Sequence, residues 1–506
     1  MPSLAAIDVG SNAIRLLIAN VESVEGERKM TILESIREPV RLGQDVFKSG
    51  TIAEETIDRA LEAFGRFKAL IDQHGVKWTK AVATSATREA QNRDLFIDRV
   101  QQHSGIEIAV IGPEEEARLI HLAVSAKINL KNKVALLVDI GGGSAEITIA
   151  ADDTILSTES FRMGAVRLLQ VLEEKRHGER KFNQLLREYV DAAQKRIRKE
   201  IGNKKIEICV GTGGNIETLG SLRQELFQKE EDSVINADEL DGIVKKLQSL
   251  TYEERIQQLH LRPDRADVIV PAAIVVQKIL RQADVDELII PSVGLKDGLL
   301  IDTIQEIYGE KKSQFRDQIV SSALQLGRKY MFDEQHGLAT VRYAAKLFDE
   351  TRNIHNLNPD TKLLLEVAAL LHDIGHFVNM TGHHKHTMYL LLATPIIGLN
   401  PGQMAVVANV ARYHRKSFPK PQHDEYRVLS SKDRVIVAKL AAILRLADAM
   451  DNEHAVRVTD FEVEYKKPKF IIRLKGEGDL LLEKWSLARK ADLFEEIFSA
   501  KVVVEE

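Results

Sequence analysis

The sequence predicts an α/β protein with a duplicated unit, followed by a helical domain and a small α+β cap. Three observations predict this fold: a strand–glycine turn–strand segment that occurs twice, α/β alternation around both copies, and helical apolar spacing beyond about residue 318. The 506 residues also exceed what one hydrophobic core usually serves, so several packed units are expected.

The duplicated segment covers residues 4–19 in its first copy and residues 136–150 in its second. Each copy has an apolar strand, an aspartate, a glycine turn and another apolar strand, so that Asp8 aligns with Asp139 and Gly10 with Gly141. Such domain-sized spacing indicates duplication of an α/β unit rather than a solenoid repeat. We therefore expect two similar lobes that face each other.

The other elements of this half also alternate between helix and strand. A helix is expected over residues 52–74, a strand ends near Thr84, and another helix opens at Pro113, where proline suits the first turn. A third glycine loop, residues 211–215, follows an apolar strand and precedes a helical segment. Strand–loop–helix is a geometry that directs backbone N–H groups at an anion.

The second half changes to helical spacing at residues 341–347, 363–371 and 435–446. After Val456, strand patterns at 461–463 and 470–474 precede a helix expected over 488–498. The polar stretch 305–317 is typical of a boundary. The expected domains are residues 1–130, 131–305, 306–455 and 456–506.

The composition limits the classes of function. A net charge of −5 speaks against global electrostatic capture of nucleic acid, so a polyanion site must be local. The single Cys209 lies in an apolar run, which fits a core residue in a reducing compartment. No apolar run reaches the ~18 residues that span a bilayer. We expect a cytoplasmic protein with no membrane or nucleic-acid partner.

The glycine turns are candidate phosphate sites, because successive N–H groups converge on an anion only where no Cβ crowds it. One such turn alone is usually structural, but two copies that each follow an aspartate favour a functional role. Arginine guanidinium groups would add planar donors. The expected phosphate-binding residues are Gly10, Ser11, Asn12, Arg15, Arg88, Gly141, Gly142, Gly143, Ser144, Gly211, Thr212, Gly213, Gly214 and Asn215.

Three carboxylates, Asp8, Asp139 and Glu146, suit a Mg²⁺ ion that bridges to phosphate oxygens. The alternative is that the two aspartates only cap their turns. The acidic residues 114–116 open a helix, and this pattern either compensates the helix dipole or supplies a base that activates water.

Six motifs lie in order at residues 8–12, 83–90, 115–120, 139–146, 211–215 and 294–298. Together they resemble the exopolyphosphatase and guanosine pentaphosphate phosphatase family, within the actin-like ATPase superfamily. The resemblance implies two actin-like, ribonuclease H-like lobes with a cleft between them, Mg²⁺ as cofactor and Glu116 as catalytic base. It further implies release of terminal phosphate from inorganic polyphosphate, guanosine pentaphosphate as a second substrate, and a homodimer.

A second candidate site lies in the helical domain. His336, His372, Asp373 and Asp448 follow the order of the HD phosphohydrolases, in which side chains from separate helices converge on a divalent metal. His386 and His414 would add a second ion, although the segment 383–386 is also typical of a polar loop. The domain would otherwise be a scaffold for polyphosphate binding and dimerisation.

Three other functions stay open. A nucleotide phosphohydrolase centred on the helical-domain site would survive Glu116→Gln and fail in Asp373→Ala. An actin-like kinase or chaperone ATPase would share the loops but require a nucleotide. A non-enzymatic sensor would bind polyphosphate or an alarmone without turnover.

Overall fold

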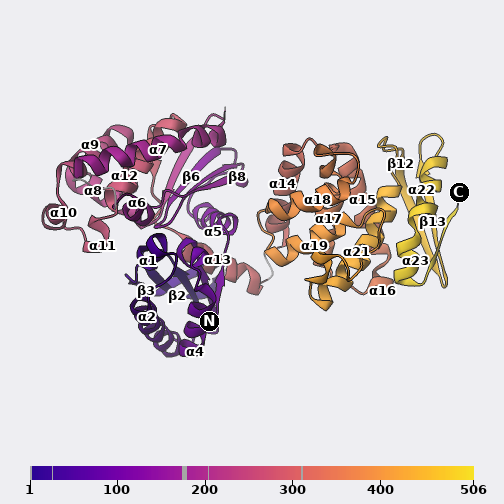
Figure 1. The fold of residues 1–506 in the computed structure, drawn as a ribbon, viewed down its shortest axis with the longest axis horizontal. Helices are drawn as coiled ribbons and strands as arrows, with labels where there is room; N and C mark the ends of the chain where they lie inside the picture. The colour runs from indigo at the N-terminus through magenta and orange to yellow at the C-terminus, as the bar shows by residue number, and fades with distance from the viewer. Residues whose placement is uncertain (1–2, 25–26, 174–178, 203, 309–311, 506) are drawn as a thin grey trace. The chain divides into compact units, whose positions relative to one another are not determined.

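The computed structural model describes residues 3–24, 27–173, 179–202, 204–308 and 312–505. The chain divides into two compact units, Met1–Lys312 and Ser313–Glu506, and each has its own fold (Figure 1). Among the described helices, none is both long enough and apolar enough to cross a membrane.

The first sheet of the N-terminal unit has the strand order β3-β2-β1-β4-β5. Strands β1, β2 and β3 pair antiparallel, whereas β4 and β5 join β1 in parallel. The five strands are β1 (Ser3–Val9), β2 (Ile14–Val24), β3 (Glu27–Glu38), β4 (Trp78–Ala83) and β5 (Ile108–Val110).

The second sheet repeats this plan in the order β8-β7-β6-β9-β11, with β10 added beyond β11. The directions match as well, since β6, β7 and β8 are antiparallel while β9 and β11 are parallel to β6. The predicted duplication is therefore confirmed. The strands are β6 (Val134–Ile140), β7 (Ala145–Ala151), β8 (Thr154–Phe161), β9 (Ile208–Thr212), β10 (Val234–Asn236) and β11 (Glu287–Ile289).

Two helices, α5 (Pro113–Ser125) and α13 (Leu295–Tyr308), pack on each other and share one apolar core with strands of both sheets. A Cβ atom added at Gly298 of α13 would lie 1.9 Å from the carbonyl oxygen of Leu119 in α5. Only glycine allows this close crossing. The start of α5 is thereby fixed beside the ends of strands from both lobes.

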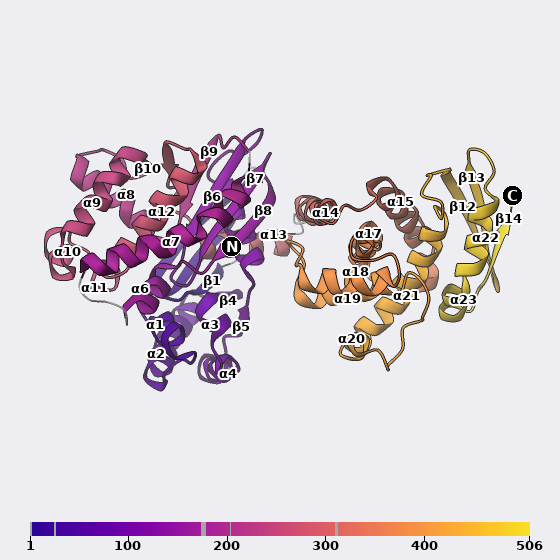
Figure 2. The ribbon, with the colours of Figure 1, turned by 45° about the horizontal axis from the view of Figure 1, so that its top comes forward.

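The remaining helices of this unit pack on the sheets or on one another. Figure 2 shows α7 and α12 against the second sheet, where both helices contact its strands. The helices expected over residues 52–74 and from Pro113 are confirmed as α2 and α5. These helices are α1 (Leu42–Ser49), α2 (Glu54–Gln73), α3 (Ser85–Glu89), α4 (Arg93–Ser104), α6 (Ala165–Glu173), α7 (Glu179–Ile201), α8 (Gly214–Phe227), α9 (Ala237–Ser249), α10 (Tyr252–Gln258), α11 (Pro263–Ala266) and α12 (Ile269–Ala283).

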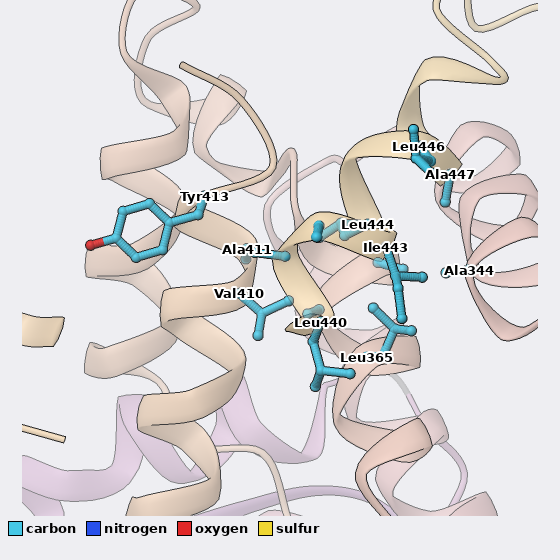
Figure 3. Close-up of a cluster of buried hydrophobic side chains, with 14 of the residues drawn as sticks. Ala344, Leu365, Val410, Ala411, Tyr413, Leu440, Ile443, Leu444, Leu446 and Ala447 are labelled. Atoms are coloured by element: carbon cyan, nitrogen blue, oxygen red, sulfur yellow. The ribbon is translucent and has the colours of Figure 1, made fainter. Parts of the chain in front are cut away.

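The C-terminal unit is built around α21 (Ser431–Ala449), which is buried on all sides over residues 440–449. A helix that is buried all round belongs at the centre of a bundle. Figure 3 shows Leu440, Ile443 and Leu444 of α21 close to Leu365 and Val410. The surrounding helices are α14 (Lys312–Lys329), α15 (Glu334–Glu350), α16 (Arg352–His355), α17 (Thr361–Leu371), the 3₁₀ helix η1 (Ile374–Phe377), α18 (His383–Ala393), α19 (Pro401–Arg412) and α20 (Asp424–Arg427).

A three-stranded sheet, β12 (Val458–Lys466), β13 (Lys469–Gly476) and β14 (Lys501–Glu505), shares the apolar core of these helices. The helical character expected over residues 488–498 is confirmed, although the helix begins earlier than expected and a break at Ala491 divides it into α22 (Leu481–Lys490) and α23 (Asp492–Phe498). The break at Ala491 lets Phe494 pack on Phe470 of β13, with ring centroids 4.8 Å apart.

Candidate active site

A pocket of about 380 Å³ in the N-terminal unit is lined by residues from both sheets. Both glycine turns, the third glycine loop and the first turn of α5 contribute to it. Thirteen of the residues expected from the sequence line this pocket: Asp8, Gly10, Ser11, Asn12, Arg15, Glu116, Asp139, Gly141, Gly142, Ser144, Gly213, Gly214 and Asn215.

The two glycine turns have the same local structure. The Gly10 N–H donates to the Ala13 carbonyl at 3.1 Å, and the Gly141 N–H donates to the Ser144 carbonyl at 3.1 Å. The turns also approach each other closely, since a Cβ atom at Gly142 would lie 2.9 Å from the Cβ of Ser11. An anion in the pocket would therefore meet backbone from both lobes.

Three carboxylates meet in this pocket region. Glu116, Asp139 and Glu146 each offer an oxygen, and these atoms all lie within 4.8 Å of one another. Glu146 Oε1 accepts from Ser160 Oγ at 2.9 Å, but the other oxygen of Glu146 and Glu116 Oε2 have no hydrogen-bond donor among the described residues. Buried carboxylate oxygens without donors are uncommon in stable proteins.

Burial sets the charge of these carboxyl groups. It raises the pKa of Asp139 to about 6 and that of Glu146 to about 7, with the neighbouring carboxylates adding to the effect. Burial, and next the charge of Glu146, raise the pKa of Glu116 well above its usual range. A divalent cation would relieve this unfavourable concentration of negative charge, and oxygen ligands of this kind suit Mg²⁺.

The strand register explains how two of these carboxylates meet. Asp139 at the end of β6 is the cross-strand partner of Glu146 on β7. The equivalent pair in the first lobe is Asp8 and Arg15. There the aspartate accepts a hydrogen bond from Arg15 Nη1 at 2.9 Å, and Asp8 is outside the three-carboxylate group.

Four of the expected phosphate-binding residues are not among those that line the pocket. Arg88 lies beside it, where its Nη1 donates to the Ile111 carbonyl at 2.6 Å and is 3.7 Å from Glu116 Oε2. Thr212 Oγ1 donates to Asp139 Oδ1 at 2.6 Å. Gly143 lies against the side chains of Ser85 and Phe47, and Gly211 against those of Ile216 and Leu288.

Four further cations line the pocket, and sequence reasoning missed them. Three are arginines on segments that carry no glycine loop, and the fourth lies within the motif at residues 294–298. That motif was the only sequence feature that could have identified one of these four cations as a pocket residue. The four residues are Arg37, Arg262, Arg265 and Lys296.

The arginines form a region of positive charge that is partly neutralised by ion pairs of Arg37 with Asp264 and of Arg15 with Asp8. Arg37 on β3 is the cross-strand partner of Arg15, and Arg265 donates to the Asn215 side chain. Burial, followed by the charges of Arg37 and Arg15, lowers the pKa of Arg265 to about 9. Such mutual repulsion is relieved by a bound polyanion, so the pocket combines a cationic region with a cluster of carboxylates.

The residues expected in the helical domain also meet. His336 on α15 and His372 after α17 have their Nε2 atoms 3.2 Å apart, and both lie near Asp448 of α21. Asp373 lies close to His383 and His414. His383, rather than the expected His386, therefore joins His414, and residue 383 begins helix α18 instead of lying in a polar loop.

Comparison with protein families gives two adjacent matches. The Ppx/GppA phosphatase family matches residues 17–307, and domain III of the Ppx/GppA phosphatases matches residues 319–496. The first match begins after the first glycine turn, so the role of that turn is argued from the structure alone.

Similar proteins cover most of the chain. A guanosine-5′-triphosphate,3′-diphosphate pyrophosphatase of Vibrio campbellii (strain ATCC BAA-1116) is 24% identical over 464 residues, which are 90% of each chain. A protein of the same name from Vibrio parahaemolyticus is 25% identical over 446 residues, covering 88% of this chain and 87% of the relative.

Two solved structures resemble part of the chain. An exopolyphosphatase from Cytophaga hutchinsonii is 26% identical with a TM-score of 0.55, covering 60% of this chain and 98% of that one. The Ppx/GppA family member of Aquifex aeolicus is 27% identical with a TM-score of 0.51, and it also covers 60% of this chain and 98% of its own.

Proposed function

The chain belongs to the Ppx/GppA phosphatase family, and from this premise we propose that its N-terminal unit releases terminal orthophosphate from inorganic polyphosphate. The observation that carries the proposal is the position of Glu116. Its Oε2 is buried without a hydrogen-bond donor, in a pocket that also holds two glycine turns and several arginines.

Glu116 is proposed as the general base. A base near neutral pH needs a pKa above that of an ordinary carboxylate, and burial provides this shift here. Helix α5 holds the side chain rigidly, because its close crossing with α13 fixes the helix next to both lobes. Arg88, at 3.7 Å from Oε2, would orient the carboxylate.

The polyphosphate end would bind to the backbone N–H groups of both glycine turns, with Arg15 and Arg265 as side-chain donors. In the reaction, Glu116 accepts a proton from water while the water oxygen attacks the terminal phosphorus. The terminal P–O anhydride bond breaks, and the shortened chain keeps the electron pair of that bond. The products are orthophosphate and a polyphosphate one unit shorter.

Mg²⁺ fits the carboxylates described above, because two of them have buried oxygens without donors. Asp139 and Glu146 would hold the ion, and it would stabilise the negative charge of the transferred phosphoryl group. Asp8, which the sequence also suggested as a ligand, would instead position Arg15 through its ion pair.

Guanosine pentaphosphate is the second candidate substrate. The curated relatives named above as guanosine-5′-triphosphate,3′-diphosphate pyrophosphatases match about nine-tenths of both chains, which favours it. Both substrates end in a phosphate held by an anhydride bond. The same turns and base would therefore serve either one.

The test is Mg²⁺-dependent orthophosphate release by the full chain from long-chain polyphosphate and from guanosine pentaphosphate. We expect release from polyphosphate, and a loss of about 10²–10⁴-fold in Glu116→Gln. Glu114→Gln is the matched control, because Glu114 lies in the same first turn of α5 but outside the pocket lining. No release from either substrate, or equal activity of Glu116→Gln and the control, would overturn the proposal.

A further inference from the structure

Three ligand atoms in the C-terminal unit form a small triangle. His336 Nε2 and His372 Nε2 are 3.2 Å apart, and they lie 3.7 and 3.6 Å from Asp448 Oδ1. A point equidistant from these three atoms is about 2 Å from each of them, which is the length of a bond from a divalent transition metal to histidine nitrogen or carboxylate oxygen. The triangle therefore has the size of a metal site.

A second triangle of the same size adjoins the first. Asp373 Oδ1 lies 3.1 Å from His383 Nε2 and 3.5 Å from His414 Nε2, and these two nitrogens are 3.2 Å apart. The equidistant point is again about 2 Å from each atom. These three residues come from three different segments: the residue before η1, the start of α18 and the segment just after α19.

Asp373 connects the two triangles. Its Oδ1 belongs to the second triangle, whereas its Oδ2 lies 3.7 Å from His372 Nε2 in the first. Oδ1 is buried and accepts no hydrogen bond from any described residue. A carboxylate that presents one oxygen to each of two adjacent sites is the usual bridge in a two-metal centre.

Three of the four histidines, His336, His372 and His414, are oriented as metal ligands. The Nδ1 of each lies next to an oxygen that can only accept a hydrogen bond, which favours a proton on Nδ1 and a lone pair on Nε2 directed at the triangle. Lone pairs on His336 and His372 that face each other at 3.2 Å repel unless a cation lies between them. The acceptors are Asp451 Oδ2 for His336 at 2.8 Å, the Ala369 carbonyl for His372 at 2.7 Å and the Ala411 carbonyl for His414 at 2.6 Å, whereas Nδ1 of His383 lies next to the Met380 carbonyl, His376 Nε2 and Arg415 Nη1.

The triangles border a cavity of about 530 Å³, a size suited to a small molecule. Lys490 Nζ donates to Asp448 Oδ2 at 2.6 Å and leaves Oδ1 to the first triangle. The guanidinium of Arg415 lies 3.3 Å from both ring nitrogens of His383. The cavity thus adds positive charge to the ligand set, and its cationic lining residues are Arg415, Lys416, Arg445, Arg489 and Lys490.

We propose that the C-terminal unit holds two divalent metal ions bridged by Asp373 and hydrolyses phosphate esters of small molecules at this centre. Imidazole and carboxylate ligands favour Mn²⁺, Fe²⁺ or Zn²⁺ over Mg²⁺. The cationic side chains of the cavity bind the phosphate. A water activated between the two ions gives a proton to solvent, its oxygen forms a new bond to phosphorus while the ester P–O bond breaks, and the leaving alkoxide takes up a proton from solvent.

This centre is distinct from the pocket of the N-terminal unit, so its test begins with the full chain carrying Glu116→Gln. The first measurement is the metal content per chain after equilibration with Mn²⁺ and removal of free ion. Because Asp139 and Glu146 can hold an ion of their own in the N-terminal pocket, the content is compared with that of Asp373→Ala: we expect the Glu116→Gln chain to hold two ions more than Asp373→Ala, and His383→Ala one ion more. His386→Ala is the matched control, because His386 is on α18 but belongs to neither triangle, and it should retain both ions.

The second measurement is Mn²⁺-dependent hydrolysis of p-nitrophenyl phosphate and bis(p-nitrophenyl) phosphate. We expect turnover of at least one ester in Glu116→Gln, a loss of about 100-fold or more when Asp373→Asn is added, and no change with His386→Ala. Circular dichroism shows whether each variant is folded, and Asp373→Asn provides a conservative change if Asp373→Ala unfolds.

The outcomes separate the proposals. A Mn²⁺ content that Asp373→Ala and His383→Ala do not lower would overturn the metal centre. Two bound ions without turnover of either ester would overturn the hydrolytic assignment. Ester turnover that is lost in Glu116→Gln alone would place the reaction in the N-terminal pocket and would also contradict the proposal.

Discussion

At the scale of single residues, the N-terminal pocket concentrates charges of the same sign in two places. Glu116, Asp139 and Glu146 are close together and buried, and Arg265 is buried near Arg15 and Arg37. Both arrangements are unfavourable in the absence of ligands and become favourable with a cation and a polyanion bound. The ligand-free pocket should therefore be strained electrostatically.

Glu146 gives the first prediction. Its pKa is raised by burial from 4.5 to about 7, so the fold favours the protonated form. The stability that this group contributes is present in full below the unfolded pKa and is lost as the pH rises through about 7. Without metal, the contribution of Glu146 to the free energy of unfolding should fall by about 3 kcal/mol between pH 4.5 and 8, in addition to the contributions of Asp139 and Glu116, and Glu146→Gln should make the total fall smaller by about this amount.

The measurement is urea unfolding of chelator-treated protein at several pH values. The two tryptophans are Trp78 in the N-terminal unit and Trp485 in the C-terminal unit, so a Trp485→Phe background makes the fluorescence report the N-terminal unit alone. Glu114→Gln is the control, since Glu114 lies outside the carboxylate group. An unchanged pH dependence in Glu146→Gln would refute the assignment.

Arg265 gives the second prediction. If it binds polyphosphate, Arg265→Gln should lower kcat/KM about 10- to 100-fold and weaken the dependence of KM on salt. Arg281→Gln is a suitable control, because Arg281 is an exposed arginine of the same unit that pairs with Asp241. Steady-state kinetics at two ionic strengths measures both effects. Equal kinetics for the two variants would show that Arg265 does not bind polyphosphate.

At the scale of elements, the pocket depends on close helix packing. The N-terminal turn of α5 carries Glu116, and α5 crosses α13 where Gly298 faces the Leu119 carbonyl. A side chain at this crossing would force the helices apart and move the proposed base. The position of Glu116 is thus determined by a glycine far from it in the sequence.

Gly298→Ala tests this packing and is the third prediction. The added Cβ would lie 1.9 Å from the Leu119 carbonyl oxygen, so the helices must separate, at a cost of about 3 kcal/mol in unfolding free energy. Gly294→Ala should change stability by less than about 1 kcal/mol, because a Cβ there meets no atom within 4 Å. Urea unfolding followed by Trp78 fluorescence compares the free energies of unfolding of the two variants. Equal stabilities would show that α5 and α13 can separate freely.

The sequence predicts the elements of this pocket better than its full set of side chains. Strand, aspartate and glycine turn are adjacent in the chain, so their geometry follows from local rules, and Pro113 marks the start of α5. Arg37 and Arg265 come from β3 and α11, and no local pattern relates them to the turns. Their convergence depends on how the two lobes pack.

The second candidate site, in the C-terminal unit, also contains a residue that the sequence alone could not identify. The sequence suggested His386 as a partner of His414, but α18 begins at residue 383 and its first residue is the one that meets Asp373 and His414. Residue spacing cannot distinguish these two histidines until the start and orientation of the helix are known. The order of His336, His372, Asp373 and Asp448 is visible in the sequence because it depends on residue identity alone.

At the scale of the whole molecule, duplication supplied two similar lobes that have since diverged in charge. Both lobes have an aspartate at the end of their first strand, and its cross-strand partner is Arg15 in one lobe and Glu146 in the other. One turn therefore lies next to a cation and the other next to a carboxylate. The proposed phosphate and metal functions follow this division.

The two units give the fourth prediction, because each has its own core and its own tryptophan. In a Trp78→Phe background, Mn²⁺ should raise the thermal midpoint reported by Trp485 by several degrees, since a ligand that binds only the folded state stabilises it. Asp373→Ala should abolish this shift and His386→Ala should preserve it. A shift that persists in Asp373→Ala would locate the Mn²⁺ elsewhere.

The central claim is that Glu116 acts in the chemical step and not in binding or folding. The most direct measurement is the affinity of Glu116→Gln for long-chain polyphosphate, compared with its rate of orthophosphate release in Mg²⁺. The claim predicts a Kd within about threefold of the unmodified chain, or lower because one negative charge is gone, and a release rate reduced about 10²–10⁴-fold. Release within tenfold of the unmodified chain, or a loss of binding that matches the loss of rate, would contradict it.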